Sequence, residues 1–172
     1  MPISPSGRVP SADVHRELLQ TRPFRSESQE ASIALLRTAS VVGRHAARVV
    51  EPHGLSLAQY NVLRILRGAG DEGLPTLAIR DRMIEEGSTV TRLLDKLEAA
   101  SLVSRSRCRP DRRQVLCTIT ESGLALLAQL DPQIDAANDA AMAALTPERR
   151  RLLIELLADI RLGLPNDVAA GG

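Results

Sequence analysis

Positive charge is concentrated in one short segment, between Ser104 and Arg113. The segment holds five arginines and one aspartate, a local charge of +4 (five minus one), whereas the formal net charge of the whole chain is only +1. Guanidinium groups form bidentate hydrogen bonds with phosphates and with guanine edges. Because ordinary loops mix both signs of charge, this segment favours an anionic nucleic-acid partner. The charged residues are Arg105, Arg107, Arg109, Asp111, Arg112 and Arg113.

A helix with one polar face is predicted just before this segment. Four apolar residues recur at i, i+3, i+4 and i+7, which places them on one stripe: Val90, Leu93, Leu94 and Leu97. The opposite face carries hydroxyl and guanidinium groups near the helix start, the end that reaches base edges in a major groove. The candidate DNA contacts are Ser88, Thr89, Thr91 and Arg92 from this helix and Arg109, Asp111, Arg112 and Arg113 from the charged segment. We expect Asp111 to orient Arg113 through a charge-assisted hydrogen bond.

Strand-like runs flank the arginines and predict a basic hairpin. Leu102 and Val103 begin one run, and residues 115–119 (VLCTI) form a second that is rich in β-branched residues. Pro110 and Asp111 lie between them and are typical of a turn. A helix followed by a basic hairpin predicts that the helix enters a DNA major groove. The hairpin then reaches the neighbouring backbone or minor groove.

This arrangement resembles the winged helix-turn-helix of the MarR family of bacterial transcriptional regulators. Four segments carry the resemblance, in the family's order and spacing: residues 88–98, 102–103, 111–113 and 118–123. One position departs from the family pattern, because Ser101 stands where a glycine is usual between the recognition helix and the wing. That position takes a left-handed conformation, which serine adopts only with strain.

The resemblance implies a mostly α-helical (α+β) fold, in which N- and C-terminal helices flank a winged helix-turn-helix and form a dimerisation region. It implies a homodimeric repressor that binds a pseudo-palindromic operator in duplex DNA and is released by a small aromatic ligand. The ligand pocket would lie between the dimerisation helices and the DNA-binding lobe. By position, its expected lining residues are His45, Arg48, Tyr60 and Arg64. No cofactor is expected.

Capping and stop signals predict the helices before the hairpin. An apolar pattern covers residues 28–50, and Ser56 with Gln59 forms a capping box that opens the next helix. A short strand at residues 74–75 is expected to pair beside the wing. Residues 76–83 are predicted to be the first helix of the helix-turn-helix, with three residues facing the core: Leu77, Ala78 and Met83.

Two more helices are predicted after the hairpin. Thr120 caps the first, and Pro132 should bend or break it. Thr146 caps the second, whose apolar stripe consists of Leu152, Leu153, Leu156, Leu157 and Ile160. The predicted organisation is a flexible extension (1–25), a dimerisation helix (26–54), a DNA-binding domain (55–120), C-terminal dimerisation helices (121–163) and a tail (164–172).

Composition narrows the function further. The chain has one Phe, one Tyr and no Trp, so it cannot build the aromatic platform on which single-strand and RNA binders stack bases. Duplex DNA is therefore the favoured nucleic acid. No stretch is long and apolar enough for a signal peptide or a membrane helix, and two cysteines do not form a disulfide framework. We expect a cytoplasmic protein.

The sequence leaves alternatives to a ligand-responsive repressor. Cys108 lies among arginines that would lower its pKa, so a thiol-based redox sensor is one alternative. A winged-helix module that binds proteins is another, although it has no need of the arginine cluster. An enzyme is not expected, because the sequence contains no nucleophile–histidine arrangement, glycine-rich phosphate loop or metal-ligand cluster.

Overall fold

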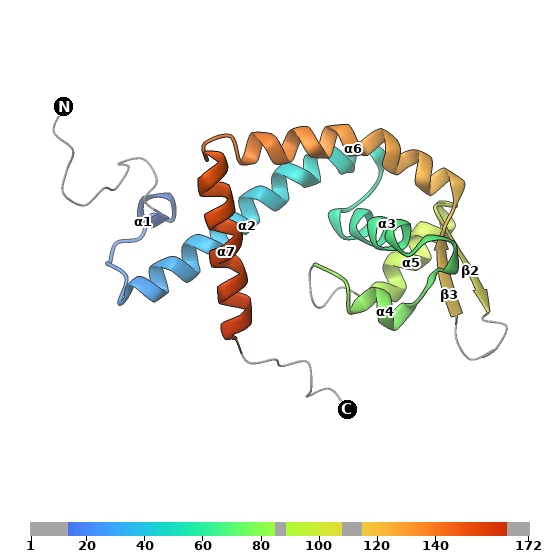
Figure 1. Cartoon of the computed structure of the whole chain (residues 1–172), viewed down its shortest axis with the longest axis horizontal. Coiled ribbons are helices and arrows are strands. Elements are labelled where there is room, and N and C mark those ends of the chain that lie inside the picture. Colours follow the sequence, from blue (N-terminus) through green and yellow to red (C-terminus); the bar gives the residue numbers. More distant parts are fainter. Residues whose placement is uncertain (1–13, 85–88, 108–114, 165–172) are drawn as a thin grey trace.

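The computed structural model describes residues 14–84, 89–107 and 115–164 and shows an elongated, mostly helical chain with a small sheet at one end (Figure 1). The helices are α1 (Val14–Glu17), α2 (Glu27–Val50), α3 (Leu57–Ala69), α4 (Thr76–Arg80), α5 (Val90–Ala99), α6 (Glu121–Ala141) and α7 (Pro147–Gly163). Short 3-10 turns occupy Glu51–His53 and Gly70–Glu72. The strands are β1 (Leu74–Pro75), β2 (Val103–Arg107) and β3 (Val115–Ile119).

Side-chain caps fix where the helices begin. The capping box at α3 is complete: the Gln59 amide donates to Ser56 Oγ at 3.2 Å, and the Ser56 amide donates to Gln59 Oε1 at 2.9 Å. Thr120 and Thr146 accept hydrogen bonds from the third helical residues of α6 and α7 in the same way. These three helix starts confirm the predictions from the sequence.

The three strands form an antiparallel sheet in the order β1-β3-β2. Leu74 lies opposite Cys117, and Val103 lies opposite Ile119. The predicted short strand beside the wing is therefore confirmed. β2 and β3 are the two arms of the predicted hairpin, and α5 leads directly into the first of them.

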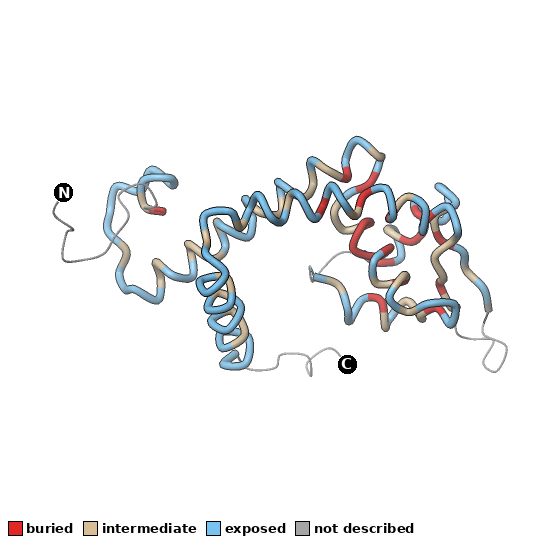
Figure 2. The backbone as a smooth tube through the Cα atoms, turned by 45° about the horizontal axis from the view of Figure 1, so that its top comes forward, coloured by how far each residue is buried: buried red, intermediate tan, exposed pale blue. Residues whose placement is uncertain are grey.

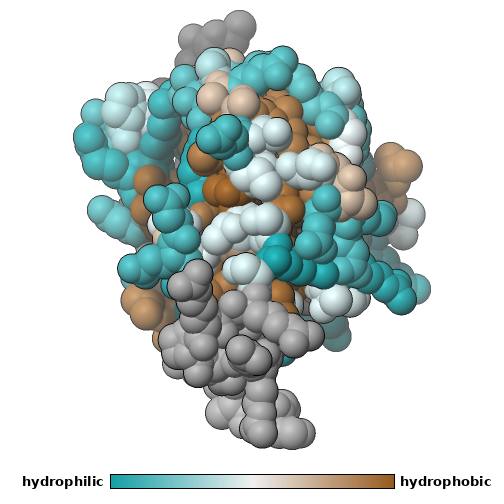
Figure 3. Space-filling model, turned by 90° about the vertical axis from the view of Figure 1, so that its right-hand side faces the viewer, coloured by the Kyte–Doolittle hydropathy of each residue, from teal (hydrophilic) through white to brown (hydrophobic). Residues whose placement is uncertain are grey.

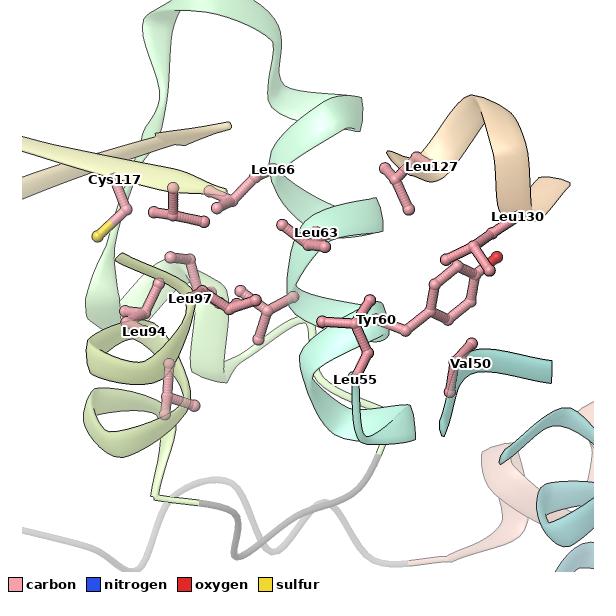
Figure 4. Packing of buried hydrophobic residues seen from close by; sticks show 14 of the residues in the cluster. Val50, Leu55, Tyr60, Leu63, Leu66, Leu94, Leu97, Cys117, Leu127 and Leu130 are labelled. Carbon is pink, nitrogen blue, oxygen red and sulfur yellow. The ribbon is translucent and has the colours of Figure 1, made fainter. Parts of the chain in front are cut away.

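One apolar core joins the sheet to α3, α5 and α6. In Figure 4, Tyr60 extends from α3 toward Leu130 of α6 and Val50 of α2, and Leu94 and Leu97 of α5 face the same cluster. Most buried residues gather in this lobe, whereas α7 carries none among its described residues (Figure 2). The lobe is therefore folded around its own core, and α7 is not part of it.

The first helix of the helix-turn-helix is shorter than predicted, and it buries a different residue. Leu77 was expected to face the core, but 63% of its surface is exposed. Ile79 is fully buried instead. Because α4 is only five residues long, one face meets the core, and the turn that follows brings Met83 into partial contact with it.

Pro132 was expected to bend or break the helix that follows the hairpin, but it does not break α6. α6 is continuous from Glu121 to Ala141 with Pro132 inside it. Proline removes the hydrogen bond to the carbonyl four residues earlier, here that of Ala128. Both residues are exposed, so water can satisfy that carbonyl.

Ser101 has the left-handed conformation that its position predicts, with φ of 59°. Its amide donates to the Glu98 carbonyl at 2.8 Å, and the Leu102 amide donates to the Leu97 carbonyl at 2.9 Å. This pair of bonds is a Schellman motif, which turns the chain from α5 into β2. The motif forms here without the glycine that usually relieves its strain.

The start of α6 is tightly joined to this same turn. Thr120 Oγ1 donates to the Ser101 carbonyl at 2.8 Å, and the Thr120 amide donates to the Leu102 carbonyl at 3.1 Å. A Cβ on Gly123 would come within 2.4 Å of the Leu102 oxygen. Gly123 therefore lets the first turn of α6 touch the backbone between α5 and β2.

Candidate nucleic-acid interface and adjoining groove

Helix α5 separates its apolar and polar residues as the sequence predicts. Val90, Leu94 and Leu97 are buried in the core. Thr89, Thr91 and Arg92 are exposed. Their hydroxyl and guanidinium groups therefore lie on the surface, at the N-terminal end of the helix, where they are free to contact a nucleic acid.

The remaining DNA contacts predicted from the sequence lie outside the described residues: Ser88, Arg109, Asp111, Arg112 and Arg113. The same holds for Cys108, the residue of the redox alternative. The strands that flank the arginine segment are described and pair directly, with Arg107 opposite Val115. Figure 3 looks onto this end of the molecule and shows hydrophilic side chains around an apolar centre.

Arg105, which contributes to the positive charge of the segment but is not one of the predicted DNA contacts, is paired with acidic side chains. Its Nη1 lies 2.7 Å from Asp95 Oδ1 and 3.4 Å from Glu98 Oε2, and its Nη2 donates to the Thr91 carbonyl at 3.3 Å. Burial alone would lower the pKa of this guanidinium, but the hydrogen bond to Asp95 and the nearby carboxylates raise it. Arg105 therefore holds β2 against α5 and compensates two carboxylates on the exposed side of that helix.

Cys117 lies opposite Arg105 in the sheet and is fully buried. Burial raises the pKa of its thiol, and the neighbouring Arg105 offsets this only in part. The thiol therefore stays protonated at neutral pH, which makes it a poor nucleophile.

A groove of about 810 Å³ adjoins the lobe that contains α5, between α2, α3, α6 and the residues that follow α4. Tyr60 and Arg64 line it, as the sequence suggested. His45 and Arg48 are exposed on α2 and are not among the lining residues that the structure describes. The lining residues include Ser40, Gly43, Arg44, Leu57, Asn61, Met83, Ile84, Ile134 and Asn138.

The groove is apolar with a positive edge. Its described lining contains two arginines, Arg44 and Arg64, and no acidic residue. The Arg64 guanidinium lies 5.9 Å from the centre of the Tyr60 ring, and Arg44 donates to Ser40 Oγ at 2.7 Å. Burial raises the pKa of the Tyr60 phenol, so that group stays neutral. An apolar cavity of this size with a few cationic groups suits an aromatic molecule with an anionic substituent.

Asn61 lines the groove and was not among the lining residues predicted from the sequence. Its side chain is only 8% exposed, and its Oδ1 accepts a hydrogen bond from the Ile84 amide at 3.1 Å. The available signal was a single polar residue inside the apolar run of α3, between Tyr60 and Val62. A buried carboxamide needs a partner, but sequence alone does not show which one.

Two other kinds of site are not found in the part of the chain that the structure describes. No group of three or more His, Cys, Asp or Glu residues there could hold a metal ion. No described helix combines the length and the apolar character needed to cross a membrane.

Comparison with known proteins agrees with this architecture. The MarR family profile matches residues 55–115. The chain is 31% identical over 169 residues to the HTH-type transcriptional regulator TtmR of Methylorubrum extorquens (strain PA1), covering 91% of this chain and 85% of that protein. It is 29% identical over 133 residues to the homoprotocatechuate degradative operon repressor of Escherichia coli, covering 77% and 88%.

A solved structure shows the same fold at appreciable identity. The crystal structure of a MarR transcription factor from Planctomyces limnophilus matches with a TM-score of 0.61 and 34% identity, over 79% of this chain and 98% of that one. The matched family segment spans α3, the helix-turn-helix and β2. With its recognition helix, winged sheet and capped flanking helices, the chain belongs to the MarR family of DNA-binding transcriptional regulators.

Proposed function

We propose that this regulator is a homodimeric repressor that binds a pseudo-palindromic operator in duplex DNA and leaves it when a small aromatic acid occupies the groove. The arrangement of side chains on α5 is the main evidence for DNA binding. The apolar face of α5 is buried, while Thr89, Thr91 and Arg92 are exposed beside the β2–β3 hairpin. Such a surface can present a helix to the major groove and a hairpin to the adjoining backbone.

The charge distribution on α5 supports the same proposal. Free carboxylates on a recognition helix would repel the phosphate backbone. Asp95 and Glu98 both lie within 4 Å of the Arg105 guanidinium, which compensates their charge. We infer that Arg92 reads a base edge and that Arg109, Arg112 and Arg113 contact the backbone or minor groove, with Asp111 orienting Arg113.

The terminal helices support assembly as a homodimer. α7 is 17 residues long and has no buried residue, and Leu152, Ile154 and Leu156 are each more than half exposed. Leu36 of α2 is 70% exposed. Apolar area of this kind on two helices is typical of an interface that a second subunit covers. A two-fold dimer presents two recognition helices, which requires an operator with two related half-sites.

The groove supports control by a ligand. Its size, apolar wall and two arginines suit an aromatic carboxylate. The Escherichia coli relative is named as the repressor of a homoprotocatechuate degradative operon, and homoprotocatechuate is itself a dihydroxyphenyl acid. A ligand of this class would release DNA if it bound more tightly to a dimer whose recognition helices are wrongly spaced.

A gel-shift titration on the DNA upstream of the protein's own gene tests the proposal. The wild type should shift this fragment at concentrations at least 100-fold lower than random DNA, and an aromatic acid should reverse the shift. Arg92→Ala should lose the preference for the fragment, whereas the control Arg151→Ala on α7 should retain it. If the wild type binds the fragment and random DNA with equal affinity, this fragment does not contain the operator. If the wild type binds no DNA at all, the proposal is wrong.

A further inference from the structure

The segment that follows α4, as far as Ile84, is held by a hydrogen bond to α3. After α4, the amides of Asp81, Arg82 and Met83 donate to carbonyls within the same turn. The next amide, that of Ile84, donates instead to Asn61 Oδ1 on α3, at 3.1 Å. The Ile84 side chain is 77% exposed and contributes little anchoring. The hydrogen bond to Asn61 is therefore the polar attachment of this segment to α3, beside the apolar contact that Met83 makes with the core.

Asn61 and Ile84 also lie in the wall of the groove. The Asn61 carboxamide has an acceptor end and a donor end. Its acceptor end binds Ile84, and within the described residues no hydrogen bond is found for its Nδ2. Because Asn61 lines the groove and its Nδ2 makes no hydrogen bond within the described residues, Nδ2 is the end of the carboxamide that a ligand in the groove could meet. One side chain thus faces the ligand space and holds the segment before the recognition helix.

We propose that Asn61 couples the groove to the recognition helix, an inference that rests on the proposed function of the groove as an effector site. In the DNA-binding state, Asn61 holds the Ile84 amide and so fixes the approach to α5. A carboxylate in the groove accepts a hydrogen bond from Nδ2 and turns the carboxamide away from Ile84. The ligand then stabilises the state in which this segment is released.

The expected size of this effect follows from one hydrogen bond. A net hydrogen bond changes an equilibrium by roughly two- to tenfold. Coupling between sites in regulated proteins is typically about 5- to 150-fold. The Asn61–Ile84 bond can therefore supply a substantial share of the response.

Two substitutions of Asn61 distinguish the role of the carboxamide oxygen, which is the acceptor, from that of its nitrogen, which is the donor. Asn61→Leu has a similar volume and removes both the acceptor and the donor. Asn61→Asp keeps oxygen acceptors for the Ile84 amide but has no amide donor and repels an anionic ligand. Gln133→Leu is the matched control, because Gln133 is an exposed amide on α6 that is not among the described groove residues and that donates to the Gln129 carbonyl of its own helix.

The first measurement uses the full-length protein without ligand. Amide hydrogen exchange by NMR should be at least tenfold faster at Ile84 in Asn61→Leu than in the wild type, and operator affinity should fall two- to tenfold. Gln133→Leu should stay within twofold of the wild type in both measurements, and Asn61→Asp, which keeps an acceptor for the Ile84 amide, should exchange more slowly at Ile84 than Asn61→Leu. If Asn61→Leu does not fold, judged by circular dichroism, Asn61→Ala replaces it. Wild-type exchange at Ile84 and wild-type operator affinity in the folded variant would overturn the proposal.

The second measurement adds salicylate or homoprotocatechuate as probe and compares binding by calorimetry with operator affinity. Asn61→Leu and Asn61→Asp should lose most of the fall in operator affinity that the probe causes, while Gln133→Leu keeps it. If the probe binds and weakens operator binding equally in the wild type and in Asn61→Leu, the coupling is disproved and the proposed function stands. If neither probe binds the wild type, the effector class is wrong, and Ile84 exchange still decides whether Asn61 holds this segment.

Discussion

Arg67 of α3 and Asp131 of α6 are joined by two hydrogen bonds, of 2.6 Å and 3.1 Å. This bidentate pair connects the DNA-binding lobe to the long C-terminal helix. The hydrogen bond to Asp131 is the main reason that the pKa of Arg67 is raised, against the opposing effect of burial. Both side chains are slightly more than one third exposed, so solvent weakens the pair.

Arg67→Ala should lower the free energy of unfolding by about 1 kcal/mol, a value already reduced for solvent screening. Chemical denaturation of Arg67→Ala, Asp131→Ala and the double variant forms a cycle that isolates the pair. If the two single losses add up in the double variant, the two side chains do not interact in solution.

Ser101→Gly should stabilise the protein by about 0.5–1 kcal/mol, because glycine adopts the left-handed conformation without a steric cost. The matched control is Ser101→Ala, which keeps the Cβ and should bring no gain. Thermal unfolding measures both. A Ser101→Gly variant no more stable than Ser101→Ala would show that the turn after α5 is not strained.

Arg105→Ala should lower DNA affinity by about five- to tenfold, because it leaves Asp95 and Glu98 uncompensated beside the phosphates. Adding Asp95→Asn and Glu98→Gln to this variant should restore most of the loss. Arg80→Ala is the control, since Arg80 is exposed and pairs with its own neighbour Asp81. If the triple variant binds no better than Arg105→Ala, charge compensation is not the role of Arg105.

Arg92→Ala and Arg113→Ala should affect DNA binding differently. Loss of a base contact by Arg92 should cost about 1–3 kcal/mol and relax the preference at one position in each half-site. Loss of a minor-groove contact by Arg113 should weaken binding to all sequences and lower the salt slope by about one per site. Salt titrations on operator and random DNA distinguish the two. Wild-type binding by Arg113→Ala at every salt concentration would rule out a wing contact there.

Leu156→Asp should weaken the homodimer, because it places a carboxylate in an apolar interface. Sedimentation at micromolar concentration should show a dimer for the wild type and a larger monomer fraction for the variant. Glu155→Gln is a control on the neighbouring exposed position. A monomeric wild type would refute the proposed assembly.

Local features of the fold could be predicted from the sequence because local chemistry determines them. Ser56 and Gln59 cap α3 across three residues, and the spacing of Leu94 and Leu97 identifies the buried side of α5. The left-handed turn at Ser101 also follows from its place after a helix.

The partners of polar side chains could not be predicted in the same way. The sequence shows only that Arg105 adds to the positive segment, because its contacts with Asp95 and Glu98 depend on how β2 packs on α5. Asn61 and Ile84 meet only after the helix-turn-helix has folded. The exposure of Leu77 could not be predicted either, because apolar spacing in so short a helix does not determine which side is buried.

The close contact at Gly123 couples the orientation of α6 to that of the recognition helix. The first turn of α6 is joined to the backbone between α5 and β2, so α6 and α5 should rotate together. A helix of 21 residues is about 30 Å long. A tilt of about 5° at one end displaces the other by about 3 Å, close to the ~3.4 Å rise of one base pair. In the proposed homodimer, a small rotation at the subunit interface would therefore move a recognition helix by almost one base-pair step along DNA.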